Sequence, residues 1–164
     1  MRVQFLPPLQ NLVELSPNSC YNLGMKLPWY VFSKGAFLHH LPLIGKATAQ
    51  SLGPIILVPD NIYRDLKSEK PNPKHIALLI HEETHRKRQK EMGYLKFAYK
   101  YIFDPKFRFQ EELLAVKEAM KYLKQMKIAF DFDKNAKFLS SYVYLWPVSK
   151  KYAEKELKKI WNEI

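Results

Sequence analysis

The sequence predicts an α+β fold, in which a small sheet in the N-terminal part packs on a mainly helical part. Residues 1–60 contain every glycine except Gly93 and most of the prolines, which is typical of short strands and loops. From Lys74 onward, apolar residues recur at helical spacing. A chain of 164 residues has the size of one ordinary domain, so we expect a single domain with a strand-rich part (1–73) and a helical part (74–164).

Two segments of the N-terminal part have the pattern of strands. They are Trp29–Phe32 and Ala47–Val58, and the second is interrupted at Gly53-Pro54. The two segments are too short for a large sheet, so we expect a small, partly irregular one.

Caps and breakers divide the helical part. Pro73 can open a helix that stops at Gly93, and Asp104 can cap another that begins with Pro105. We expect helices over residues 74–92, 94–103, 105–127 and 149–164, with a break at 131–135. The aromatic segment 138–146 fits a strand and a helix equally well.

Composition excludes several classes of protein. No apolar run approaches the roughly 20 residues of a membrane-spanning helix, and prolines interrupt the N-terminus before a signal-peptide core can form. The single cysteine, Cys20, cannot form an internal disulfide, which fits a reducing compartment. We therefore expect a soluble, cytoplasmic protein. Nothing in the sequence indicates an oligomeric state.

The segment His81-Glu82-Glu83-Thr84-His85 has the pattern of a metallopeptidase helix. Residues four apart share one helix face, so both imidazoles can bind the same ion. Zn²⁺ held by neutral imidazoles brings the pKa of its bound water to about 7. Glu82 is then placed to act as the general base in peptide hydrolysis. The alternative is two solvent-facing histidines on a charged helix.

A catalytic zinc site also needs a third protein ligand. The extended metzincin pattern fails, because Arg88 and Glu91 occupy the positions of its glycine and third histidine. Glu112 is the best candidate, since it shares an apolar helix stripe with Phe109 and Val116, and a buried carboxylate needs a partner. An ion pair between Glu112 and Arg108 is the alternative. Glu111 fits a solvated or supporting acid better, although the sequence does not settle which of the two is the ligand.

Other polar residues favour structural roles. His39 and His40 lie in a loop, and His75 is expected to face away from the metal side of its helix. Tyr142 and Tyr144 could stabilise an oxyanion, but ordinary aromatic packing explains them more simply.

Three segments together resemble the minigluzincins, small soluble metallopeptidases similar to the catalytic domains of integral-membrane peptidases. The segments are 52–59, His81–His85 with Gln89 and Gly93, and 108–115. The resemblance implies a gluzincin-type zinc hydrolase, with His81, His85 and Glu112 as ligands and Glu82 as the base. It also implies an extended peptide or protein substrate that adds to a strand near residues 47–58. The sequence departs from the family pattern at Leu114, where many relatives have a second acid.

Two other classes of function remain as alternatives. One is a catalytically inactive zinc-binding or interaction protein. The other is a basic nucleic-acid-binding module, suggested by a formal net charge of +11. That charge is mostly lysine spread over the helices, and no nucleic-acid-binding motif accompanies it, so a solvated basic surface is the favoured interpretation.

Overall fold

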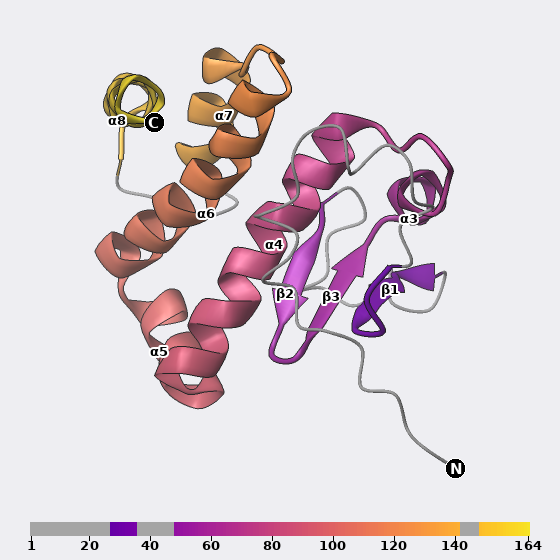
Figure 1. Cartoon of the computed structure of the whole chain (residues 1–164). Helices are drawn as coiled ribbons and strands as arrows, with labels where there is room; N and C mark the ends of the chain where they lie inside the picture. Colours follow the sequence, from indigo (N-terminus) through magenta and orange to yellow (C-terminus); the bar gives the residue numbers. More distant parts are fainter. Residues whose placement is uncertain (1–26, 36–47, 142–147) are drawn as a thin grey trace.

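The computed structural model describes residues 27–35, 48–141 and 148–164. Within these ranges a small sheet lies on one side of helix α4 (Pro73–Met92), and the later helices, from α5 (Tyr94–Phe103) to α8 (Lys150–Glu163), lie on the other (Figure 1). The predicted α+β class, with an N-terminal sheet packed on a helical part, is confirmed.

The sheet has three short strands in the order β1-β3-β2. Strand β1 (Val31–Ser33) runs parallel to β3 (Ile55–Val58), and β2 (Gln50–Leu52) runs antiparallel to it. The predicted interruption at Gly53-Pro54 is the turn of the β2–β3 hairpin. Gly53 has a φ of 60° there, a conformation that favours glycine. Among the described strands β2 pairs with β3 alone, so it is an edge strand of the sheet.

A short helix, α3 (Asp60–Leu66), follows β3 directly and was not predicted. Its sequence contains only two buried positions, Ile62 and Leu66, which is too little for a clear helical period. Both side chains belong to the core that the sheet forms with α4. The helix is thus stabilised by tertiary packing rather than by its own pattern.

The three central helices lie close to their predicted positions. They are α4 (Pro73–Met92), α5 (Tyr94–Phe103) and α6 (Pro105–Gln125). As predicted, Asp104 caps α6, where its carboxylate accepts a hydrogen bond from the Phe107 amide. Helix α6 ends two residues before the predicted Lys127, because Lys127 adopts a left-handed φ of 55° that stops the helix.

The C-terminal part contains α7 (Phe132–Leu139) and α8 (Lys150–Glu163). A break was predicted at 131–135, but only Asp131 lies outside a helix, and residues 132–135 belong to α7. Asp131 is the N-cap of α7, and its side chain accepts a hydrogen bond from the Lys134 amide. Of the ambiguous segment 138–146, residues 138 and 139 end α7, and residues 142–146 lie outside the described ranges. Helix α8 matches the predicted 149–164 to within one residue at each end.

Two apolar clusters lie on either side of the α4–α6 pair. The first joins the sheet, α3 and one face of α4, and the second joins α6, α7 and α8. Between them, Ala77 of α4 meets Ala119 and Leu123 of α6, so small side chains let the two helices approach closely. No helix of the described chain is long and apolar enough to cross a membrane.

We predict that Met120→Ala lowers the free energy of unfolding by about 2–5 kcal/mol, because Met120 is fully buried in the second cluster and its truncation leaves a cavity. Urea denaturation checks this. Leu114→Ala on the same helix is the control, since Leu114 is 45% exposed and should change stability by no more than about 0.5 kcal/mol. Equal losses in both variants would contradict the assignment of the core.

Candidate metal centre

Helix α4 is held in place at both ends and on one side. Asn72 accepts a hydrogen bond from the Lys74 amide at its start, and the helix ends at Gly93, which has a φ of 89°. Near its C-terminal end, Gln89 bonds with the β2–β3 hairpin: it accepts from the Gly53 amide at 2.7 Å and donates to the Ser51 carbonyl at 3.1 Å. These bonds fix the face of α4 that carries His81 and His85.

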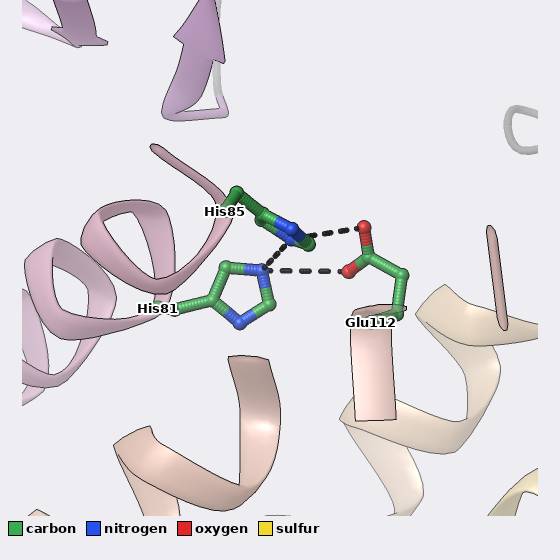
Figure 2. Close-up of side chains that lie close together, drawn as sticks. All are labelled: His81, His85 and Glu112. Carbon is green, nitrogen blue, oxygen red and sulfur yellow. Dashed lines mark hydrogen bonds and ion pairs between the residues drawn. The ribbon is translucent and has the colours of Figure 1, made fainter. Parts of the chain in front are cut away.

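His81 and His85 lie one turn apart on α4 and point toward Glu112 on α6 (Figure 2). The two Nε2 atoms are 3.2 Å apart. Glu112 Oε1 lies 3.2 Å from His85 Nε2, and Glu112 Oε2 lies 3.4 Å from His81 Nε2. Three potential ligand groups from two helices therefore converge on one point, with His85 and Glu112 buried and His81 partly exposed.

The separations of these atoms suit a small tetrahedral ion. Ligand atoms about 2.0–2.1 Å from such an ion lie about 3.3–3.4 Å from one another. The separation of 3.2 Å between the two Nε2 atoms is close to that edge length. Each Nε2 atom also lies near a different oxygen of the Glu112 carboxylate, at 3.2 Å from His85 to Oε1 and 3.4 Å from His81 to Oε2. The donor set of two imidazoles and one carboxylate leaves a fourth position for water, so the residues fit a metal site of the catalytic kind.

Helix α5 braces the carboxylate of Glu112. The Tyr101 hydroxyl donates a short hydrogen bond to Glu112 Oε1. The Tyr101 ring also meets the His85 ring edge-on, with 6.1 Å between centroids. Arg108 Nη1 donates to the carbonyls of Tyr101 and Ile102 and so holds the last turn of α5. Tyr101 thus contacts two members of the cluster, and it orients His85 by ring packing.

The electrostatics of Glu112 agree with this arrangement. Burial by itself would raise the pKa of the Glu112 carboxyl, but the charges and hydrogen bonds of His85 and His81 hold that pKa well below its usual value. Glu112 is therefore an ionised, buried carboxylate. Such a group needs a cationic or hydrogen-bonding environment around it.

Glu82 lies next to His81 and is also buried. Burial raises the pKa of Glu82 to about 7, with His81 opposing this shift and Glu112 adding to it. A hydrogen bond with the Ser51 backbone and the charge of Lys34 also lower the pKa. Glu82 therefore lies between the triad and strand β2, in a setting where a proton can be gained or lost near neutral pH.

Two further acids on the same helices form ion pairs with arginines. Glu111 makes a paired hydrogen bond with Arg88 of α4, at 2.8 and 3.1 Å, and is buried. Of the two roles expected for Glu111, a solvated acid or a supporting acid, the first is wrong, because Glu111 is buried where it meets Arg88 of α4. Glu83 makes a similar pair with Arg86, whose guanidinium lies 4.0 Å from the centre of the Tyr30 ring. Neither acid belongs to the triad.

The structure separates the other sequence candidates from the triad. His75 faces away, as predicted, and its Nδ1 lies 2.7 Å from an Asp65 carboxylate oxygen. Leu114, where the sequence departs from the minigluzincin pattern, is half-exposed. Cys20, His39, His40, Tyr142 and Tyr144 lie outside the described ranges.

Sequence reasoning missed Tyr101 and Lys34. Tyr101 follows Phe97 by one helical turn, and this spacing could have predicted that both face inward from α5. In the structure the two rings stack with 5.5 Å between their centroids. Lys34 is 1% exposed, and burial lowers its pKa while the charge of Glu82 opposes this. No pattern around Lys34 pointed to the site.

Comparisons of the chain with protein-family models, with curated proteins and with solved structures find no match. Its function must therefore be inferred from the side chains themselves.

We predict about one metal ion per chain in the purified protein, lost in His85→Ala and in Glu112→Gln, because each change removes one of three ligands. Elemental analysis of protein prepared without chelator measures this. His75→Ala is the control, since it changes a histidine of the same helix that pairs with Asp65 instead. Unchanged metal content in both ligand variants would contradict the site.

We also predict that Tyr101→Phe weakens metal affinity by about 10- to 100-fold, because it removes the hydroxyl that orients Glu112. Competition with a chromogenic chelator measures the affinity. Tyr99→Phe is the matched control on the same helix, where the side chain is 67% exposed. Equal affinities for the two variants would show that Tyr101 does not support the site.

Proposed function

We propose that this protein is a zinc-dependent metallopeptidase of the gluzincin type. The observation that carries the proposal is the buried convergence of His81, His85 and Glu112, with the carboxylate of Glu82 on the next position of the same helix. The spacing of the histidines and the position of Glu82 are those of a metallopeptidase helix. The resemblance of the three sequence segments to the minigluzincins supports the same assignment.

Zinc is the metal that this donor set favours. Two imidazole nitrogens with one carboxylate oxygen and one open position form a catalytic zinc site, whereas calcium and magnesium prefer ligand sets made of oxygen atoms. When bound, zinc would polarise both the substrate carbonyl and a water molecule and bring the pKa of that water to about 7.

Glu82 has the central role among the protein groups. Its carboxylate accepts a proton from the attacking water and passes that proton to the leaving amine. The hydrogen bond with the Ser51 backbone holds the carboxyl between α4 and strand β2, so Glu82 does not need to reorganise before the transfer. His81, His85 and Glu112 hold the metal, and Tyr101 orients Glu112.

The substrate is proposed to be an extended peptide or protein segment lying along β2. This strand is at the edge of the sheet and is attached to α4 by Gln89, beside the triad. Backbone pairing with an edge strand binds a peptide with little regard to its side chains. Because the Ser51 backbone is already bonded to Gln89 and Glu82, pairing would use the chain on the N-terminal side of Ser51.

We predict that Glu82→Gln lowers the rate of peptide hydrolysis by at least about 100-fold without loss of zinc, because the amide cannot accept a proton. Hydrolysis of a fluorogenic peptide library by zinc-loaded protein, with zinc content measured in parallel, tests this. Glu91→Gln is the control, since Glu91 is an exposed acid on the same helix. A zinc-loaded wild type that cleaves no peptide would instead favour an inactive zinc-binding protein.

A further inference from the structure

The outer face of α5 is apolar and exposed. It consists of Leu95, Tyr99, Ile102 and Phe103, which are 89%, 67%, 57% and 69% exposed. These residues follow the spacing i, i+4, i+7 and i+8, so they form one stripe along the helix. The rings of Tyr99 and Phe103 contact each other at 5.0 Å between centroids, which makes the stripe continuous. Single exposed apolar side chains are common on surface helices, but four large ones in a continuous stripe of a ten-residue helix indicate an interaction site.

The opposite side of α5 is used by the fold. Phe97 is buried, and Tyr101 reaches Glu112, so α5 packs on α4 and α6 through these side chains. The helix lies at the end of the molecule where α4 ends and α6 begins (Figure 1). The outer face is therefore not the side of α5 that packs on the rest of the protein. It is a second apolar face, on a helix whose other side is already packed.

The charge beside this face is positive. Lys96 and Lys100 are exposed on α5, and Lys106 is exposed at the start of α6. Residues 94–106 contain these three lysines and one acid, Asp104, which caps α6. The nearby Glu91 of α4 is paired with Arg88. An apolar stripe of leucine, isoleucine and aromatic residues, flanked by lysines, is the pattern of a helix that lies in a membrane interface.

A second copy of the chain fits this face less well. A two-fold contact through α5 would bring Lys96 and Lys100 of both copies together, within a chain whose net charge is +11. Four side chains on a ten-residue helix also fall short of the roughly 800 Å² per partner that a standard interface buries. An anionic lipid surface accepts both the apolar residues and the lysines.

We propose that the outer face of α5 docks the protein on an anionic membrane surface, with Leu95, Tyr99, Ile102 and Phe103 entering the interface and Lys96 and Lys100 contacting lipid headgroups. The docked helix would carry Tyr101 on its inner side, so the metal centre lies close behind the bilayer surface. This inference does not depend on peptidase activity, because docking is measured without a peptide substrate.

The experiment is cosedimentation of the full chain with vesicles. We expect binding to vesicles of phosphatidylserine and phosphatidylcholine in equal parts, and at least about tenfold weaker binding to phosphatidylcholine alone. The Lys96→Gln, Lys100→Gln double variant and the Leu95→Ser, Phe103→Ser double variant should each lose about tenfold or more. Metal content and circular dichroism equal to those of the wild type show that the variants are folded.

The matched control is the Lys151→Gln, Lys155→Gln double variant, which removes two exposed lysines at the same four-residue spacing from α8. It should lose much less binding than the α5 lysine variant. No vesicle binding by the wild type, or equal losses in the two lysine variants, would overturn the proposal. So would a wild-type dimer that becomes monomeric in the Leu95→Ser, Phe103→Ser variant, since the face would then join two copies.

Discussion

The structure depends on how helices α4 and α6 bury charge between them. Glu112 of α6 faces His81 and His85 of α4, and Glu111 of α6 is bonded to Arg88 of α4. Both glutamates are buried. A buried ionised group costs free energy unless it is paired and hydrogen-bonded. Helix α6 therefore has to meet α4 at a position where its two acids face the histidines and Arg88 of α4. This requirement restricts the register of α4 on α6 more tightly than apolar packing alone would.

The bonds that satisfy these groups also connect the elements around the site. Arg88 and Glu111 join α4 to α6, Gln89 joins α4 to the hairpin, and Tyr101 joins α5 to Glu112. A polar network of this kind is specific, because a shift of one residue in any helix would leave several buried groups unpaired. The triad is thus oriented by the same contacts that define the fold.

Local patterns predicted the parts of this arrangement that depend on neighbours in the sequence. The spacing of His81 and His85 fixes their shared face, Asp104 is a helix cap from its residue type and position, and Glu112 follows from the stripe of α6. The remaining features depend on contacts between elements. Tyr101 reaches Glu112 because α5 packs on α4 and α6. Lys34 comes near Glu82 because β1 pairs with β3, which packs on α4. Helix α3 is stabilised by a core to which it contributes two residues. The periodicity of a single segment does not predict contacts of that segment with distant elements.

The links between the three central helices are very short. Gly93 alone separates α4 from α5, and Asp104 alone separates α5 from α6. The first and last triad residues, His81 and Glu112, therefore belong to one nearly continuous helical stretch of the chain. The entropic cost of closing a loop grows only slowly with its length, so bringing His81 and Glu112 together across this stretch costs less than pairing the ends of the chain would. All three residues of the cluster thus come from a single stretch of chain, which includes neither strand β1 nor helix α8.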